Sequence, residues 1–318
     1  MSARTPRILT VALFACLVLP RLASAQYVPP AGSWEHREPE ELGLDAAAIA
    51  AAIEFAQASE SQSPRDLLES HYRSFAREPF GEAIGPMKTR GPQTGLIVKD
   101  GYIVAEWGDP ARVDMTFSVT KSFLSTTVGL AWAAGLIKSV DDQVGPYLPP
   151  VLLPPGDGEP GDEAGTGFGA RRPVNLFESE HNRQITWNHL LRQVSDWEGT
   201  LWGKPDWSDR PASDPNEWLT RERPAPGILY EYNDTRVNLL ALAATLVWRK
   251  PIQQVLLEGI MRPIGASPTW RWHGYENSWI LLDGTNVQVP SGGGHWGGGM
   301  FINAYDQARF GLLTARRY

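Results

Sequence analysis

The sequence predicts an α+β protein, and three segments carry that prediction. Residues 94–108 alternate apolar and polar side chains around the pair Asp100-Gly101, which is a strong signal for a β-hairpin. Residues 116–136 start as a polar turn and continue as an apolar helix. Residues 238–250 read as an amphipathic helix that stops before a proline.

The bulk composition excludes several classes of protein. A chain of 318 residues with 42% hydrophobic side chains can bury the core of one large domain or of two closely packed ones. A net charge of −7 argues against a nucleic-acid partner, because binding phosphates needs a basic face. The six histidines show no ligand spacing, and no phosphate loop or dinucleotide fingerprint is present, so no metal and no cofactor are predicted.

Residues 1–25 have the pattern of a secretory signal peptide. Two arginines precede an apolar run from Ile8 to Leu19, and small residues end at Ala25. We therefore expect cleavage after Ala25, a mature domain over residues 26–318, and a periplasmic or secreted location.

Two alternatives for this segment are weaker. The apolar run is too short to span a hydrocarbon layer of about 30 Å, so no stable membrane anchor is expected after cleavage. A lipoprotein signal at Cys16 would need polar residues after the cysteine, and these are apolar. Because Cys16 is the only cysteine, the mature chain would have no thiol nucleophile, thiolate metal site or disulfide.

The remaining elements follow in chain order. Residues 45–59 predict a helix, and residues 151–173, rich in Gly, Pro and acidic residues, predict a surface insertion or flexible lid. Residues 185–199 read as a short helix that runs into a turn. The tail from residue 291 predicts a glycine-rich turn, a short strand and a helix that starts near Asn303.

Ser118 and Lys121 are the first candidate catalytic residues. A serine three residues before a lysine occurs about once by chance in a chain of this length. The ordinary explanation of such a pair is a helix that starts at the serine, with the lysine side chain extended so that its ammonium group is solvated. Here, however, Ser118 lies near the first turn of a long apolar helix, whose unpaired N–H groups stabilise a developing oxyanion. Lys121 shares its helix face, and burial would make the amine a better proton acceptor.

Six segments in a fixed order carry a resemblance to a known superfamily. They are "GLIVKDGYIVAEWG", "MTFSVTKSFLSTTVGLAWAAGLI", "DDQVGPYLP", "ITWNHLLRQVSDWEG", "PGILYEYNDTRVNLLALAATLV" and "GGGMFINAYDQARFGLL". Together they resemble the serine beta-lactamase and penicillin-binding-protein superfamily. They look closest to the class C-type branch, which also contains esterases, D-aminopeptidases and nylon-oligomer amidases. The resemblance covers nearly all of the mature chain. It implies an antiparallel sheet flanked by helices, a mainly helical subdomain and a covalent acyl-serine intermediate.

The resemblance also assigns roles to individual residues. It implies that the substrate acylates Ser118, that Lys121 helps to deprotonate this serine, and that Tyr232 shuttles protons. Asp234 stands where the family's Tyr-x-Asn motif has asparagine and is the candidate substrate-binding residue. An ionised aspartate only accepts hydrogen bonds and would hold Lys121 in its charged form, so an ester, peptide or other amide substrate is favoured over dedicated beta-lactam hydrolysis.

Two further motifs are interpreted as decoys. Tyr275-Glu276-Asn277 is a literal Tyr-x-Asn, but no amphipathic helix follows it. The segment "VSDW" at residues 194–197 resembles the Ser-Asp-Asn of class A enzymes, yet it falls where the resemblance expects a structural turn.

The family's third motif, which supplies one oxyanion-hole N–H from a strand, has no clear counterpart. His295-Trp296-Gly297 is a His-x-Gly, but it runs straight into a segment that normally precedes the third motif. His295 is therefore a secondary substrate-site candidate, with a turn or structural hydrogen bond as the alternative. We expect an incomplete sheet and a C-terminally truncated chain; loss of one oxyanion donor costs about 10²–10³ in turnover.

Tryptophans are concentrated between the first two motifs. They form either an aromatic rim for a substrate, with Trp197 as the candidate contact, or the packing of a loop-rich subdomain. The five in this stretch are Trp187, Trp197, Trp202, Trp207 and Trp218.

The sequence therefore predicts a secreted serine hydrolase that cleaves an ester or amide bond in a small-molecule or peptide substrate. A non-catalytic protein that binds peptidoglycan or a partner through the same cleft is the alternative. A histidine-based esterase that uses Ser118, His295 and Asp306 is a third hypothesis. The sequence carries no signal for the oligomeric state.

Overall fold

The computed structural model describes residues 26–75, 77–153, 172–209 and 215–316. The predicted signal peptide, residues 1–25, and most of the predicted insertion at 151–173 lie outside the described residues. No helix in the described ranges has the length and apolar character to cross a bilayer.

The α-helices are α1 (Ala46–Ala58), α2 (Leu67–Phe75), α3 (Thr120–Ala133), α4 (Glu180–Arg183), α5 (Trp187–Leu191), α6 (Pro215–Thr220), α7 (Asp234–Trp248), α8 (Ile252–Leu256) and α9 (Ala304–Arg316). Short 3₁₀ turns are η1 (Pro39–Leu42), η2 (Phe117–Val119) and η3 (Gly145–Tyr147), and η4 (Leu257–Met261) is a π-helical turn. The strands are β1 (Gly95–Lys99), β2 (Tyr102–Trp107), β3 (Asp114–Met115), β4 (Val151–Leu153), β5 (Arg172–Val174), β6 (Thr200–Leu201), β7 (Lys204–Pro205), β8 (Arg271–Leu282), β9 (Thr285–Pro290) and β10 (Gly299–Ile302).

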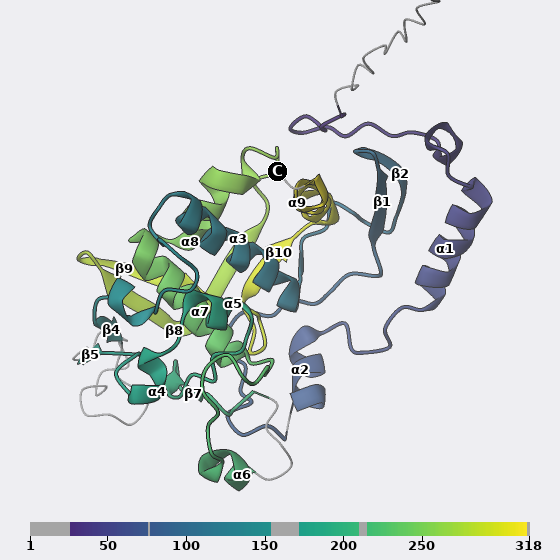
Figure 1. The fold of residues 1–318 in the computed structure, drawn as a ribbon. Helices are drawn as coiled ribbons and strands as arrows, with labels where there is room; N and C mark the ends of the chain where they lie inside the picture. The colour runs from purple at the N-terminus through teal and green to yellow at the C-terminus, as the bar shows by residue number, and fades with distance from the viewer. Residues whose placement is uncertain (1–25, 76, 154–171, 210–214, 317–318) are drawn as a thin grey trace, which may run out of the picture.

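The α+β class and the antiparallel sheet are confirmed. Four strands pair in the order β3-β10-β8-β9, and every pairing among them is antiparallel. The predicted hairpin is β1 and β2, and the turn residues Asp100 and Gly101 both have positive φ, as a tight two-residue hairpin turn requires. The hairpin forms a separate two-stranded sheet, against which α9 packs (Figure 1).

Helix α7 is the centre of the fold. It begins at Asp234, where the side chain of Asn233 accepts a hydrogen bond from the N–H of Arg236, and its residues from Asp234 to Leu246 are all buried. It packs against α3, α5, α8 and β9 (Figure 1). An amphipathic helix at 238–250 would have one exposed face, and this part of the prediction is wrong. Neighbouring elements cover the helix on all sides from Asp234 to Leu246.

The tryptophans between the two motifs mainly pack the core. Trp187, Trp197 and Trp202 are buried, and the Nε1–H of Trp197 donates to the carbonyl of Leu176 at 2.7 Å. A side chain that is 1% exposed cannot meet a substrate, so the prediction of a substrate contact at Trp197 is corrected. The side chain of Trp218 lies outside the description.

A buried network of charges joins the loop at 194–198 to the start of α7. Asp196 is 2% exposed, and its carboxylate accepts hydrogen bonds from Arg221, Arg223 and Arg236. Arg236 also donates to Glu231 at 2.7 Å. The "VSDW" segment is a loop, as predicted, and it is a buried anchor for the residues that flank Tyr232.

Candidate active site

Ser118 lies in a tight turn that is fixed from both sides. It is the middle residue of η2, which runs directly into α3, and Phe117 before it has a φ of 47°, in the left-handed region. The N–H and the hydroxyl of Thr116 both donate to the carbonyl of Met300, and the hydroxyl of Thr120 accepts the N–H of Met300 at 2.9 Å. Strand β10 therefore holds the serine at the N-terminal end of the helix, where backbone N–H groups favour negative charge.

The structure brings Ser118, Lys121 and Tyr232 together. The Nζ of Lys121 donates to the Oγ of Ser118 at 3.1 Å, and the Tyr232 hydroxyl donates to the same Oγ. The ammonium also lies 4.5 Å from the centre of the Tyr232 ring. Two groups able to transfer protons thus meet at one serine oxygen, from segments 114 residues apart.

Asp234 binds Lys121 and faces away from solvent. Its Oδ1 accepts from the Nζ of Lys121 at 2.6 Å, its Oδ2 accepts the N–H of His295 at 2.9 Å, and it is 1% exposed. The predicted direct substrate contact of Asp234 is therefore replaced by a role in holding the lysine.

The ion pair sets the charge of both groups. Burial lowers the pKa of Lys121, but the negative charge of Asp234 and their hydrogen bond outweigh burial, so the pKa lies above its usual value. Burial likewise raises the pKa of Asp234, and the charge of Lys121 outweighs it and holds that pKa below its usual value. Both groups are ionised at neutral pH, as the sequence predicted for an aspartate at this position.

Gly293 allows the glycine-rich turn to lie directly on this ion pair. A Cβ at this position would collide with the Nζ of Lys121 and the Oδ2 of Asp234. The glycine is therefore required by the close approach of the backbone.

A cavity of about 250 Å³ opens beside Ser118. Its walls come from α2, from the serine turn and from the glycine-rich turn; the lining residues are Leu67, Ser70, His71, Ser74, Phe75, Phe117, Ser118, Gly293 and His295. His71 bonds the carbonyl of Gly81 at 2.7 Å, and burial lowers its pKa, so it is neutral at pH 7. The neutral imidazole of His71, the ring of His295, two serines and apolar side chains thus line the cavity beside the nucleophile.

A larger cavity, of about 580 Å³, lies elsewhere, beside Asp141 and Tyr147. It shares no lining residue with the cavity at Ser118, and none of the catalytic candidates reaches it. We place the candidate site at the smaller cavity because that cavity contains the nucleophile.

The histidine-based alternative does not fit the geometry. The Nε2 of His295 bonds the carboxylate of Glu78 at 2.8 Å, and Asp306 accepts hydrogen bonds from Ser267, so His295 and Asp306 do not form a relay to Ser118. His295 does line the cavity.

The second tyrosine motif is structural. Tyr275 is fully buried, its hydroxyl accepts from Asn238 and Ser291, and burial raises its pKa. It is a core residue of β8, in agreement with its interpretation as a decoy.

The sequence did not indicate the part that α2 plays in the site, nor Glu78 and Asp209. The segment "LLESHYRSF" has apolar residues at helical spacing, which predicts a helix but not the surface that it covers. Glu78 and Asp209 come close to His295 only through the tertiary fold.

A serine at the mouth of a buried helix, with a lysine one turn later and a tyrosine from a second segment, defines a serine–lysine–tyrosine site on an α+β fold. The chain belongs to the beta-lactamase family: the profile of that family matches residues 92–317. The search of curated proteins gives no match.

Three solved structures are among those similar to this chain. They are a beta-lactamase from Mycobacterium bovis (19% identity, TM-score 0.36, 68% of this chain and 53% of that one), an octameric penicillin-binding protein homologue from Pyrococcus abyssi (19%, 0.44, 70% and 52%) and a beta-lactamase/D-alanine carboxypeptidase from Yersinia pestis (18%, 0.38, 68% and 60%). The chain thus spans between about half and three fifths of the length of these structures.

Proposed function

We propose that the protein is a secreted serine hydrolase that cleaves an ester or amide bond through an acyl-enzyme on Ser118. The observation that carries this proposal is the convergence of Lys121 and Tyr232 on the Oγ of Ser118. Membership of the beta-lactamase family supports the reaction type. The export of the chain and its place in the class C-type branch belong to the same proposal, and they rest on the sequence patterns above.

The proposed reaction has two halves. The Oγ of Ser118 attacks the substrate carbonyl carbon. Its proton passes to the Tyr232–Lys121 pair when Lys121 is a neutral amine. The same pair returns that proton to the leaving alcohol or amine as the bond to the carbonyl carbon breaks. A water molecule then attacks the carbonyl carbon of the acyl-serine ester and gives a proton to the pair. The pair returns this proton to the Oγ of Ser118 as the ester bond breaks, and the acid leaves.

The cavity favours a compact acyl group. Its volume of about 250 Å³ is below the range of about 300–1,000 Å³ that is usual for drug-sized ligands. Phe75, Phe117 and Leu67 offer apolar contacts, and Ser70 and Ser74 offer hydroxyl groups. We therefore propose small esters or amides of uncharged acyl groups as the substrates to test first.

A mass-spectrometric labelling experiment tests the proposed nucleophile. Incubation with a fluorophosphonate probe is expected to add one probe mass per chain, and proteolytic mapping is expected to locate it on the peptide that contains Ser118. Labelling on another residue, or none at any pH at which the chain is folded, would refute the assignment.

The pH dependence of acylation is expected to shift when Asp234 is replaced by asparagine. In the wild type the neutral amine of Lys121 forms only as pH rises through its raised pKa, so the rate of labelling should rise toward alkaline pH. Asp234→Asn removes the charge that raises this pKa and leaves the effect of burial, which lowers it. The rising limb of the pH–rate profile should therefore move to lower pH.

The profile of labelling rate against pH measures this shift, with Asp283→Asn on the surface as a control that should leave it unchanged. An unchanged profile in Asp234→Asn would show that Lys121 is not the titrating base.

The ion pair also favours a second function. A lysine held in its charged form at neutral pH is a weak base, so the same cavity could serve a protein that binds peptidoglycan or a partner without cleaving it. Saturable binding of a muropeptide without any covalent adduct would support this function over the hydrolase.

A further inference from the structure

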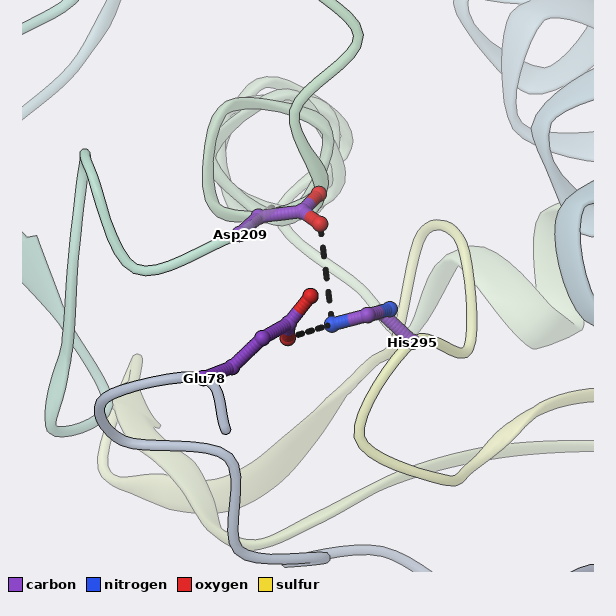
Figure 2. Close-up of side chains that lie close together, drawn as sticks. All are labelled: Glu78, Asp209 and His295. Carbon is purple, nitrogen blue, oxygen red and sulfur yellow. Dashed lines mark hydrogen bonds and ion pairs between the residues drawn. The ribbon is translucent and has the colours of Figure 1, made fainter. Parts of the chain in front are cut away.

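Three segments far apart in the chain meet at one cluster of ionisable side chains. Glu78 follows α2, Asp209 follows β7, and His295 lies in the glycine-rich turn. The Nε2 of His295 lies 2.8 Å from the Oε2 of Glu78 and 3.5 Å from the Oδ1 of Asp209 (Figure 2). One donor atom from each residue lies within 4.8 Å of the other two.

The cluster is enclosed by the protein. Asp209 and His295 are 3% and 4% exposed, and the side chain of Glu78 is 11% exposed. The N–H of Asp234 donates to the second oxygen of Asp209 at 2.5 Å, which orients this carboxylate. Two carboxylates held next to one imidazole in a protein interior favour positive charge nearby, and Lys204 supplies part of it through its interaction with Glu78.

The donors of the cluster are chemically suited to a metal ion. The Nε2–H of His295 makes its short contact with Glu78 at 2.8 Å and lies 3.5 Å from Asp209, whereas an ion accepts electron pairs from all three side chains. Zinc bonds of about 2.0–2.2 Å place tetrahedral ligands about 3.3–3.6 Å apart. The 2.8 Å separation of His295 and Glu78 must therefore widen when an ion binds, whereas the 3.5 Å separation of His295 and Asp209 already matches.

We propose that Glu78, Asp209 and His295 form a binding site for a divalent transition-metal ion, with zinc as the best match. An imidazole nitrogen favours zinc over calcium or magnesium, which prefer all-oxygen ligands. Three protein ligands leave a fourth position for a water molecule or a small anion. Of the three, His295 also lines the cavity that contains Ser118.

The three donors come from widely separated parts of the chain. No short ligand motif could therefore indicate this site in the sequence, and the earlier prediction of no metal rested on such motifs.

Calorimetric titration of the metal-free protein with zinc chloride tests the proposal. The wild type is expected to bind one zinc ion per chain. Glu78→Gln and His295→Ala each remove a direct ligand, so each should lower the zinc affinity at least as much as the loss of an outer partner of a ligand, which typically costs about 10–100-fold. Cobalt(II) in place of zinc should give visible absorption bands in the wild type that both variants lack.

His36→Ala provides a matched control. His36 also lies close to a carboxylate, that of Glu106 at 3.4 Å, but it is exposed, and its replacement should leave zinc binding unchanged. Because Glu78→Gln keeps the size of the side chain, a folded variant is expected even if His295→Ala disturbs the turn.

No zinc binding by the wild type, or equal binding by the wild type and Glu78→Gln, would overturn the proposal. The titration does not depend on the reactivity of Ser118, so its result is independent of the proposed hydrolase function.

Discussion

Ser118→Ala is expected to abolish covalent labelling and to lower hydrolysis of a small ester by a factor on the order of 10⁶, the loss found when a serine hydrolase loses its nucleophile. The hydroxyl is the only group at this position that can form the acyl bond, and the Lys121–Tyr232 pair would have no oxygen to activate. Steady-state hydrolysis and intact-mass measurement of the labelled protein check the two parts of this expectation.

Ser122→Ala is the matched control for the nucleophile. Ser122 lies on the same helix, one residue after Lys121, and is exposed, so its loss should leave labelling and turnover within about twofold of the wild type, since surface substitutions change little. Labelling that survives Ser118→Ala would reject the acyl-enzyme on this residue.

Lys121→Arg complements the test, because it keeps a cation beside Asp234 but removes the proton acceptor; we expect turnover to fall by about 10²–10⁴.

Asp196→Ala is expected to destabilise the folded protein by about 3–5 kcal/mol, the usual cost of removing one partner from a buried charge network. Asp196 and Arg236 are each 2% exposed, and the guanidinium of Arg236 donates to Asp196 at 2.7 Å. Without the carboxylate, Glu231 and Asp206 would be left to balance the charges of the three arginines that Asp196 binds, and the buried Arg236 would lose its 2.7 Å partner. Urea denaturation followed by tryptophan fluorescence measures the loss.

A surface pair of the same chemistry provides the comparison. Asp283 pairs with Arg249, and the two side chains are 50% and 59% exposed, so Asp283→Ala should cost only about 0–1 kcal/mol. Equal losses for the two aspartates would mean that the network around Asp196 contributes no more than solvent-exposed charges do.

Local sequence chemistry predicted the elements whose cause is local. The hairpin turn at Asp100-Gly101 needs positive φ at two positions, and both residues have it. The spacing of Ser118 and Lys121 placed them on one helix face, and the structure brings both into contact with each other.

The features that sequence reasoning missed depend on contacts between distant segments. Nothing in the residues around α7 shows that other elements cover all its sides, and nothing near Trp197 shows that its indole bonds to Leu176 inside the core. The cavity wall formed by α2 and the approach of Glu78 to His295 likewise depend on how remote segments pack. Local patterns report the conformation of a segment, and burial against other segments decides its role.

The attachment of the serine turn to strand β10 has a consequence for biosynthesis. Thr116 and Thr120 bond to Met300, at sequence separations of 184 and 180 residues. Contacts of such long range form late, because the intervening chain must be ordered first. Until residue 300 has emerged from the ribosome, a nascent chain lacks the strand that fixes its own reactive hydroxyl. The serine turn can therefore take up its active geometry only after this region has been translated.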